Sequence, residues 1–403
     1  MRLPGFVCKA MEKLKNGGFE AFVVGGPVRD LLLGAVPFDW DIATSALPEE
    51  VMEVFSEYRV IPTGIKHGTV TLICDNGMIE ITTFRTEGAY LDNRHPQNVT
   101  FSGKIEEDLK RRDFTINALA YNPETGVLDL FGGKADLERK TIRCVGEPYM
   151  RFSEDALRIM RALRFSAVLG FEIEENTSKA IFSCKELLKN ISAERIAIEL
   201  SKLIMAENPR DVLIKYRVVF EEIFEIDIVE DIWDESVEAV SRAEKNLSVR
   251  LALILREKTA EVLKRLKYDN KTIAYAVITA KYLHINLSPE PYLIKKELSG
   301  IGERALRLAL AAKKACFSVP DDNLLKVEDA LNHILRKGEC FSLRQLDIKG
   351  GDICSIFKVQ GEEIGLMLDV LLEAVIRGQC QNKKENLISY LKDYISNQNG
   401  GLK

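Results

Sequence analysis

The sequence predicts an α/β domain at the N-terminus followed by a C-terminal part that is entirely helical. Up to about residue 146, short apolar runs typical of strands alternate with amphipathic segments typical of helices. From residue 152 onward, nearly every segment repeats its apolar residues with the period of a helix. A chain of 403 residues is too long for one core, so we expect about two to four domains.

The composition is that of an ordinary soluble protein, with 46% hydrophobic and 29% charged residues, and the cytoplasm is the expected location. A net charge of -5 gives no overall field that favours a polyanion, so nucleic acid would have to meet a local basic surface. The 8 cysteines are scattered without a CxxC pair, which favours free thiols in a reducing compartment over disulfides or a zinc site. We find no apolar run long enough to span a bilayer and no signal-peptide pattern.

The stretch 22–42, FVVGGPVRDLLLGAVPFDWDI, predicts a site for a metal–nucleotide complex. It contains a buried strand, a tight turn at Gly25 and Gly26, a short helix and a second strand carrying two carboxylates. Strand side chains alternate, so Asp39 and Asp41 project from the same face. Such carboxylates repel each other unless a cation lies between them, and oxygen ligands suit Mg²⁺. The two glycines let the backbone approach a phosphate, and the next helix offers it free N–H groups.

Helices are expected on both sides of this stretch. The first covers about 5–15, ahead of the buried strand. The second lies within 44–55, TSALPEEVMEVF, where Thr44 or Ser45 is the expected N-cap and acidic residues occupy the first turn.

A β-hairpin follows. The alternating runs 68–74 and 78–85 are joined by Asp-Asn-Gly, and Asn-Gly between such runs is a strong hairpin signal. The second strand carries Glu80 among apolar neighbours, where a carboxylate is costly to bury unless it meets a cation. The polar segment 86–98, TEGAYLDNRHPQN, predicts a mobile loop.

The run 110–122, KRRDFTINALAYN, is a basic cluster that leads into a predicted helix. Arg111, Arg112 and Asp113 would open that helix. Asn117 would lie inside it. A charged first turn is usually only solvated, whereas its place after the hairpin and loop favours contact with a nucleotide.

The remaining chain is predicted to be helical, without the regular period of a stacked solenoid. The segment 152–171, FSEDALRIMRALRFSAVLGF, is a strong helix that Gly170 ends. Breaks are expected at Pro289 and Pro291 and again at the pair Gly350-Gly351. The other predicted helices are 193–205, 211–224, 235–256, 259–267, 270–283, 302–315, 322–337, 361–378 and 383–396.

The start of the 152–171 helix has a purely structural interpretation. Ser153 would cap it, and Glu154 and Asp155 would complement the positive N-terminus. Arg158 would pair with Glu154 at i,i+4.

The same helix also has a functional interpretation. Arg158, Arg161 and Arg164 repeat every third residue along one face, and guanidinium groups match phosphate oxygens in a fork. Asp155 beside Arg158 would read a base edge, since an acid accepts from an exocyclic amine while arginine donates to ring acceptors. Cytosine and adenine offer that amine, whereas uracil and guanine carry a carbonyl oxygen at the equivalent position. Spacing alone does not choose between the two interpretations.

Several other classes of enzyme lose support. The dinucleotide motif GxGxxG and the phosphate loop GxxxxGK[ST] are both absent. No HD or HExxH pair exists, so a histidine–metal hydrolase is not supported. The 4 histidines are isolated: His67, His95, His284 and His333. The carboxylate pair instead favours two-metal phosphoryl transfer.

Taken together, these motifs resemble the class II tRNA nucleotidyltransferase family of CCA-adding enzymes and bacterial poly(A) polymerases. The resemblance covers about 20–205 and rests on GGPVRDLLLG, FDWDIATSALPEEV, FRTEGAYLDNRHP, RRDFTINALAYN, DLFGGKADL and EDALR, in that order. It extends more loosely to 348–375, which looks like the helical tail of the family. There the chain has Gly361-Glu362 where the family usually has Gly-Pro.

The resemblance implies a palm-like nucleotidyltransferase head at 1–146, a neck at 147–206, a helical body at 207–320 and a tail at 321–403. Catalysis would depend on Asp39, Asp41 and Glu80, the first two holding Mg²⁺. The implied nucleotide-binding residues are Gly25, Gly26, Arg29, Arg112, Asp113, Asn117, Glu154, Asp155, Arg158, Arg161 and Arg164. Asp155 and Arg158 would form the protein template that accepts CTP and ATP and rejects UTP and GTP.

The implied reaction is attack of a tRNA 3′-hydroxyl on the α-phosphate of CTP or ATP, with release of pyrophosphate, until the CCA end is complete. A flexible loop containing Tyr90, Asp92 and Arg94 goes with addition of the terminal A in this family. The implied partners are therefore tRNA, through its acceptor stem and 3′ end, CTP and ATP, with no membrane and no evident protein partner. Local basic residues expected to meet RNA are Lys110, Arg111, Lys134, Arg139, Lys140, Arg143, Lys383 and Lys384.

Three alternatives remain. An A-only enzyme shares all these motifs. A poly(A) polymerase of the same family is disfavoured because long basic extensions are absent. A non-catalytic RNA-binding protein is disfavoured because the metal carboxylates and the Asp155–Arg158 pair are all intact.

Overall fold

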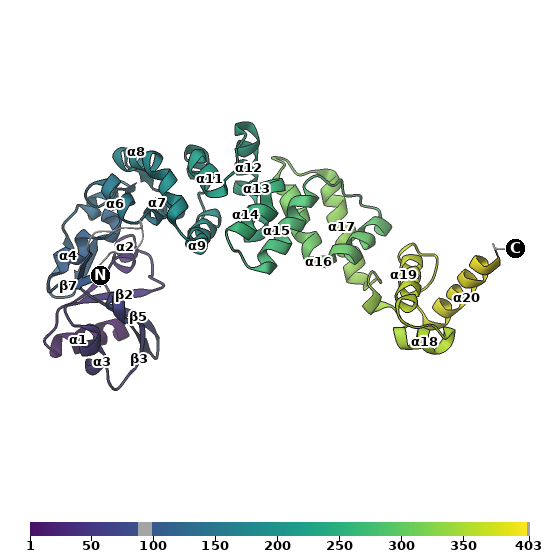
Figure 1. Ribbon diagram of the computed structural model, residues 1–403, viewed down its shortest axis with the longest axis horizontal. Coiled ribbons are helices and arrows are strands. Elements are labelled where there is room, and N and C mark those ends of the chain that lie inside the picture. The colour runs from purple at the N-terminus through teal and green to yellow at the C-terminus, as the bar shows by residue number, and fades with distance from the viewer. Residues whose placement is uncertain (88–98, 401–403) are drawn as a thin grey trace. The chain divides into compact units, whose positions relative to one another are not determined.

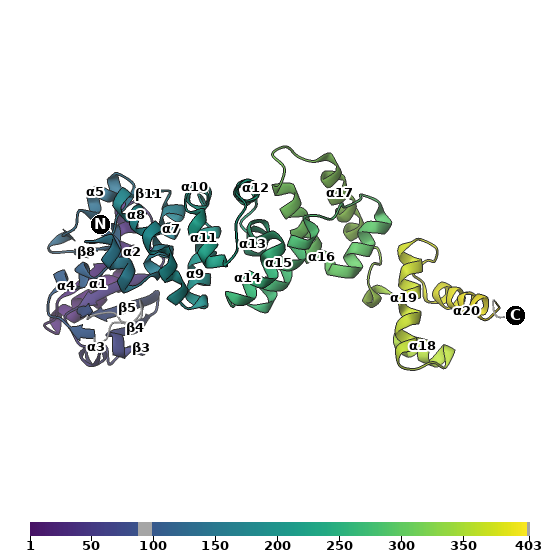
Figure 2. The same ribbon diagram turned by 45° about the horizontal axis from the view of Figure 1, so that its top comes forward.

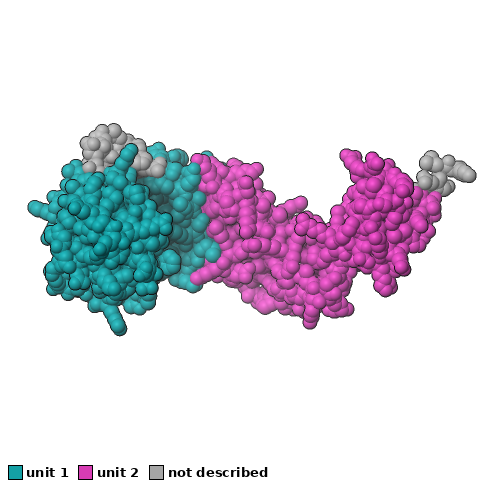
Figure 3. Space-filling view, turned by 90° about the horizontal axis from the view of Figure 1, so that it is seen from below, with its two compact units in different colours: residues 1–229 teal, residues 230–403 magenta. Residues whose placement is uncertain are grey.

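The computed structural model describes residues 1–87 and 99–400 (Figure 1). The chain divides into two compact units, 1–229 and 230–403, coloured separately in Figure 3. The first unit contains every sheet of the described chain, and helices are the only regular elements among the described residues of the second. This confirms the predicted change from an α/β domain to helical structure, except that a two-residue strand, Glu172–Ile173, lies in the part predicted to be helical.

The first unit is built on a seven-stranded mixed sheet with the order β3-β4-β5-β2-β1-β8-β9. Neighbouring strands are antiparallel except β2 and β5, which run parallel. The strands are β1 (Ala21–Val24), β2 (Trp40–Thr44), β3 (Arg59–Gly64), β4 (Thr69–Cys74), β5 (Gly77–Thr83), β8 (Leu119–Asn122) and β9 (Gly126–Asp129). Two small pairs complete the strands: β6 (Arg85–Glu87) with β7 (Val99–Phe101), and β10 (Thr141–Ile142) with β11 (Glu172–Ile173).

The helices of the head lie against this sheet. Helix α1 contacts the strands β1 and β2, and helix α3 contacts β4 and β5; the two helices also contact each other. Figures 1 and 2 show both helices beside the sheet. Helix α2 lies at the other end of β1 and contacts β1, β2 and β8. The head helices are α1 (Gly5–Asn16), α2 (Gly26–Leu32), α3 (Pro48–Val54), η1 (Ile65–His67), α4 (Ile105–Lys110), η2 (Thr115–Asn117) and α5 (Gly133–Glu138).

A helical layer completes the first unit. Its central helix is α7, which contacts α6, α9 and α10. These helices are α6 (Pro148–Glu154), α7 (Leu157–Leu169), α8 (Glu175–Cys184), η3 (Lys185–Asn190), α9 (Ala193–Ile204), α10 (Arg210–Lys215) and α11 (Arg217–Phe224).

Two apolar cores are formed by described helices in the C-terminal part of the second unit. One lies between α15, α16 and α17, and the other between α18, α19 and α20. The helices of the second unit are α12 (Glu230–Arg242), α13 (Leu247–Leu255), η4 (Arg256–Lys258), α14 (Thr259–Arg265), α15 (Asn270–Tyr282), α16 (Pro291–Ala315), α17 (Asp322–Lys337), η5 (Leu343–Gln345), α18 (Gly350–Phe357), α19 (Glu362–Ile376) and α20 (Lys384–Gly400).

The hairpin prediction is confirmed. Strands β4 and β5 pair with Cys74 opposite Gly77, which leaves Asp75 and Asn76 as the turn. The first helix and the helix end at Gly170, where φ is +67°, are confirmed as well.

Several local predictions were wrong, among them the single helices predicted over 211–224 and 235–256, which the structure divides into α10 and α11 and into α12 and α13. Helix α3 is capped at Leu47, whose N–H donates to the Glu50 carboxylate, because Thr44 is still paired in β2. Ser153 lies inside α6, since a break at Asp155 separates α6 from α7. The break predicted at Pro289 is present between α15 and α16, but Pro291 already begins α16 at its first turn, where its missing N–H costs nothing. The pair Gly350-Gly351 opens α18.

The helix predicted over 110–122 was also wrong. Helix α4 ends at Lys110, before the arginine pair, and only a short 3-10 turn carries Asn117. The apolar residues that follow form β8, which pairs with β1 on one side and β9 on the other. Burial between two strands overrides the helical preference of the Ala-Leu-Ala run.

Candidate active site

The turn between β1 and α2 brings backbone and arginine side chains together. Gly25 adopts φ +73°, and a Cβ there would lie 2.8 Å from Nη1 of Arg112. The Gly25 N–H donates to the carbonyl of Leu119 over 3.0 Å, which fixes the turn against β8. A glycine is therefore required at this position.

The carboxylates come from adjacent parallel strands. Asp41 on β2 is in register with Glu80 on β5, while Asp39 lies just before β2. Burial raises the pKa of Asp41 to about 6; Arg112 opposes this rise, and Glu80 and Asp39 add to it. A cation would relieve the repulsion that remains.

The donor set fits a divalent metal at Asp39 and Asp41. Both offer carboxylate oxygens, which are the ligands of Mg²⁺ and other hard cations. Within 1–87 and 99–400, no group of three or more His, Cys, Asp or Glu side chains is arranged to hold a metal ion. Glu80 thus lies near Asp41 without completing a three-acid cluster, and water or phosphate oxygens would supply the other ligands.

A cavity of about 700 Å³ opens at the carboxylates and is lined by the head and by helices α7 and α9. Its described lining holds eight arginines and five aspartates, so its charge favours an anion. The predicted site residues in the lining are Gly25, Gly26, Arg29, Asp39, Asp41, Arg112, Asp113, Asn117, Asp155, Arg158, Arg161 and Arg164. Glu80 and Glu154 are not among the lining residues. Tyr90, Asp92 and Arg94 lie outside the described residues.

Arg29 and Arg161 are fixed by buried polar partners. Arg29 Nη1 donates to Asn117 Oδ1 over 2.8 Å, and Asn117 Nδ2 donates to Asp113 over 3.2 Å. Arg161 Nε donates to the other oxygen of Asp113 over 2.7 Å. Burial tends to raise the pKa of Asp113, but Arg161 and the hydrogen bonds to the carboxylate hold it below 3.8. Asp113 and Asn117 therefore orient two arginines.

A buried ring supports the same arginines. The guanidinium carbons of Arg29, Arg161 and Arg164 lie 5.2, 5.4 and 4.0 Å from the ring centre of Phe165. Arg164 also lies 2.5 Å from Glu199 of α9, as an ion pair without hydrogen-bond geometry. These contacts hold three positive groups at one wall of the cavity.

Arg111 and Arg112 share one buried acid. Arg111 Nη2 donates to one oxygen of Asp108 over 2.7 Å, and Arg112 Nη2 to the other over 3.1 Å. Burial would raise the pKa of Asp108, but the charges and hydrogen bonds of Arg112 and Arg111 outweigh burial and hold it below 3.8. Sequence reasoning overlooked Asp108, although it precedes the arginines at helical spacing.

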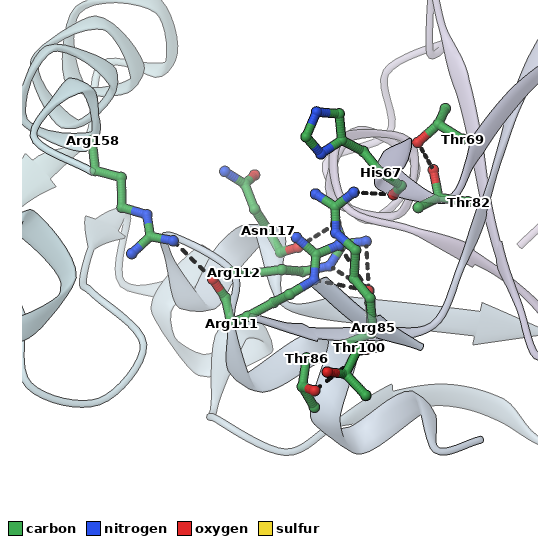
Figure 4. A network of polar contacts seen from close by, with 11 residues as sticks. His67, Thr69, Thr82, Arg85, Thr86, Thr100, Arg111, Arg112, Asn117 and Arg158 are labelled. Atoms are coloured by element: carbon green, nitrogen blue, oxygen red, sulfur yellow. Dashed lines mark hydrogen bonds and ion pairs between the residues drawn. The ribbon is translucent and has the colours of Figure 1, made fainter. Parts of the chain in front are cut away.

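Arg158 is held by several protein acceptors. Its Nη1 lies 2.5 Å from Glu154, which confirms the predicted i,i+4 pair, and also donates to the Arg151 carbonyl over 3.0 Å. Its Nη2 donates over 3.1 Å to the carbonyl of Arg111, and Figure 4 shows this contact between α7 and the head. Arg158 thus ties the α6–α7 junction to the arginine pair.

Asp155 meets a residue that sequence reasoning missed. Arg195, from α9, lies 2.9 Å from Asp155 Oδ2 through Nη2 and 3.4 Å from Oδ1 through Nη1. The Leu157 N–H donates to Asp155 Oδ1 over 3.1 Å. The signal in the sequence was Arg195 and Glu199 at i,i+4 on one helix, both directed toward the cavity wall.

Two further lining residues were missed, His67 and Arg85, which lie just before β4 and just after β5 at the open end of the hairpin. Arg85 Nη1 donates to the His67 carbonyl, as Figure 4 shows. Among the basic residues expected to meet RNA, Arg111 lines the cavity. Arg143 pairs with Asp136 and Lys384 with Asp352.

Together, the mixed sheet, the carboxylate pair and the arginine-lined cavity define a nucleotidyltransferase head. The model of the poly(A) polymerase head domain matches 21–143. The model described as a probable RNA- and SrmB-binding site of polymerase A matches 170–217, and the putative tRNA nucleotidyltransferase domain 2 matches 241–391.

Known CCA-adding enzymes match nearly the whole chain. That of Streptococcus gordonii is 36% identical over 411 residues, covering 95% of this chain and 96% of that protein. That of Leuconostoc mesenteroides is 36% identical over 396 residues, covering 96% of each. The crystal structure of the Bacillus stearothermophilus CCA-adding enzyme in complex with CTP has a TM-score of 0.84 at 30% identity and covers 100% of both chains.

The chain therefore belongs to the family of CCA-adding enzymes, which are tRNA nucleotidyltransferases related to poly(A) polymerases. Membership of this family indicates dependence on a divalent metal ion. No helix among the described residues is long and apolar enough to cross a membrane.

Proposed function

We propose that this chain adds CMP and AMP from CTP and ATP to the 3′ end of tRNA and thereby builds or repairs the CCA terminus. The observation that carries the proposal is one cavity lined by Asp39 and Asp41, by eight arginines, and by Asp155. The carboxylates suit metal-assisted transfer, the arginines suit a triphosphate, and Asp155 suits recognition of an exocyclic amine.

The residues divide into three tasks. Asp39 and Asp41 would hold Mg²⁺, which when bound activates the attacking hydroxyl and stabilises the leaving pyrophosphate. Glu80, in register with Asp41 on the neighbouring central strand, adds negative charge beside Asp41 and so favours binding of the cation. The predicted head, neck, body and tail at 1–146, 147–206, 207–320 and 321–403 are retained as part of this proposal.

The arginines would bind and orient the triphosphate. Arg29, Arg161 and Arg164 converge over Phe165, and Arg112 lies across the turn at Gly25. Fixed guanidinium groups cost little reorganisation when charge develops on the pyrophosphate.

Base selection is assigned to Asp155, with Arg158 and Glu154 shaping its surroundings. Arg158 is 7% exposed and holds Glu154 and two carbonyls, so its replacement by alanine would disturb the α6–α7 junction as well as base contact. Asp155→Asn is the cleaner test of the template, because it changes the acceptor character of the group with little change of shape.

The A-only enzyme remains the second candidate function, since all the residues above serve either reaction. A poly(A) polymerase and a non-catalytic RNA-binding protein are the further alternatives. We also propose a cytoplasmic location, which the absence of disulfides among all eight cysteines supports.

One assay tests these alternatives. Purified protein, Mg²⁺ and labelled CTP or ATP are incubated with tRNA transcripts that end before CCA, after CC, or after the complete CCA. The proposed enzyme extends the first by three nucleotides and stops. An A-only enzyme extends only the CC-ended transcript, and a poly(A) polymerase continues without stopping. No incorporation into any transcript would overturn the proposal and favour a binding protein.

A further inference from the structure

Two large apolar side chains near the carboxylates are almost fully exposed. Phe38 is 96% exposed and Val36 is 92% exposed. Both lie in the connection between α2 and β2, directly before Asp39. Phe38 lines the cavity, whereas Val36 does not.

The connection between α2 and β2 is closed at one end and leads directly into a buried strand residue at the other. Helix α2 ends with Gly34 at φ +76°, and the Ala35 N–H donates back to the Asp30 carbonyl over 2.8 Å, which closes the helix end. Pro37 is buried between the two exposed residues and has a fixed φ. Strand β2 begins three residues later with buried Trp40. The connection is therefore anchored by a buried residue on each side of Phe38, namely Pro37 and Trp40.

The Phe38 ring has no cover comparable to that of the other phenylalanine in the described lining. Phe165 is 6% exposed, and three guanidinium groups lie over or beside its ring. Phe38 presents its ring to the cavity and to solvent. A flat apolar group of this kind suits stacking against a base.

The base that stacks on Phe38 could belong to the incoming nucleotide or to the RNA end. The charged groups suited to the incoming nucleotide come from elsewhere, namely α2, α7, α9 and the segment that follows α4. The RNA end, in contrast, must bring its 3′-hydroxyl to Asp39 and Asp41, and Phe38 is the residue next to Asp39. Proteins that hold single-stranded RNA ends commonly stack the bases on aromatic side chains.

We propose that Phe38 is a stacking platform for the 3′-terminal base of the RNA, which places its terminal hydroxyl beside Asp39 and Asp41. This inference rests on the proposed nucleotidyl transfer to RNA. It assigns to the α2–β2 connection a role in binding the RNA end rather than the nucleotide.

The test measures steady-state addition of AMP to a CC-ended tRNA transcript by the wild type, Phe38→Ala, Phe38→Trp and Val36→Ala. Loss of one base–aromatic stack predicts that Phe38→Ala raises the KM for tRNA by about 5- to 150-fold. The KM for ATP should change less than about twofold, and Phe38→Trp should restore the wild-type KM for tRNA. Val36→Ala is the matched control, because Val36 is equally exposed but lies outside the cavity lining.

A second substrate isolates the base. A CC-ended transcript whose 3′-terminal nucleotide lacks its base keeps the attacking hydroxyl. The wild type should have a higher KM for the abasic transcript than for the intact one, whereas in Phe38→Ala the two KM values should be nearly the same. The stacking role of Phe38 would be overturned, with the proposed function intact, by either of two results. One is an equal KM for tRNA in the wild type and Phe38→Ala; the other is that removal of the base raises the KM by the same factor in both proteins. A wild type that extends no transcript would instead overturn the proposed function, and this inference with it.

Discussion

The guanidinium of Arg195, on α9, donates two hydrogen bonds to the carboxylate of Asp155, with Nη2 2.9 Å from Oδ2 and Nη1 3.4 Å from Oδ1. Both Asp155 oxygens are thus engaged, one of them also by the Leu157 N–H. A carboxylate held in a fork keeps one orientation, which a group that distinguishes base edges requires.

Arg195 should therefore control base selection through Asp155. We expect Arg195→Ala to slow addition by up to about 100-fold and to raise UTP incorporation relative to CTP, approaching the ratio seen for Asp155→Asn. Arg195→Lys keeps the charge but not the fork, so its ratio should be intermediate. Single-nucleotide incorporation from competing CTP and UTP measures this. Arg210→Ala is the control, because its partner Asp211 is 91% exposed; an unchanged UTP-to-CTP ratio in Arg195→Ala would refute the prediction.

Asp41→Asn should abolish nucleotide addition while tRNA still binds. The substitution keeps the shape of the side chain but removes the negative charge that holds a cation. We expect at least about a 100-fold loss of kcat, measured by labelled AMP incorporation, with tRNA affinity followed by gel shift. Glu124→Gln, at an exposed turn of the head, is the control. Turnover close to the wild-type rate in Asp41→Asn would exclude Asp41 as a metal ligand.

The requirement for Mg²⁺ should depend on pH. Burial raises the pKa of Asp41 to about 6, so a proton competes with the cation below that pH. The half-saturating Mg²⁺ concentration should rise as pH falls from about 7.5 to 5.5, because binding must then displace a proton. Titrations of activity with Mg²⁺ at several pH values measure this. A half-saturating concentration that stays constant over this range would contradict the proposed ligation.

Asp108→Asn should destabilise the head. It leaves Arg111 and Arg112, whose side chains are 18% and 19% exposed, without their shared acid. We expect a loss of about 3 kcal/mol at neutral pH, or a lower melting temperature by roughly 5–10 °C. Calorimetry of the variant and of Asp211→Asn, an exposed control, measures it.

The same variant tests the pH dependence. The pKa of Asp108 in the folded chain lies below its ordinary value of 3.8. Its stabilising effect is therefore complete above about pH 4 and is lost as pH falls through the folded-state pKa. The difference in melting temperature between wild type and Asp108→Asn should shrink below pH 4. A difference that is the same at pH 3 and pH 7 would exclude a stabilising charge on Asp108.

Gly133→Ala should lower both stability and activity. A Cβ at Gly133 would lie 2.2 Å from the backbone oxygen of Thr115, closer than any real contact. Relief requires movement of η2, which carries Asn117 and follows Asp113. We expect a destabilisation of about 2–4 kcal/mol together with a higher KM for ATP. Gly103→Ala, where a Cβ would meet nothing within 4 Å, should behave as the wild type. An unchanged melting temperature in Gly133→Ala would show that the Thr115 backbone moves away at no cost, and would contradict the prediction.

The sequence predicted the parts of the site that depend on strand alternation and turns. Asp41 and the hairpin carrying Glu80 follow from local patterns, and the structure brings both strands together in register. The cap at Ser153 and the helix through Asn117 were wrong, because tertiary pairing decided where α7 begins and where β8 replaces a helix.

The partners that hold the arginines could not be predicted from local patterns. Glu199 and Arg195 lie on α9, and only folding shows that they meet Arg164 and Asp155. Likewise, Phe38 looks like an ordinary apolar residue in the sequence. Its exposure, beside the buried Pro37 and after the closed end of α2, becomes visible only in the folded structure.

The pairs that shape the cavity join residues far apart in the chain. Arg29 and Asn117 are separated by 88 positions, Arg161 and Asp113 by 48, and Arg195 and Asp155 by 40. Contacts of such long range close large loops, so they form together with the sheet and the helices that carry them. Binding of CTP to the cavity would therefore report folding of the segment from Arg29 to Arg195, which lies within the first compact unit. A ligand-dependent rise in melting temperature would measure how strongly CTP binding is coupled to folding of that unit.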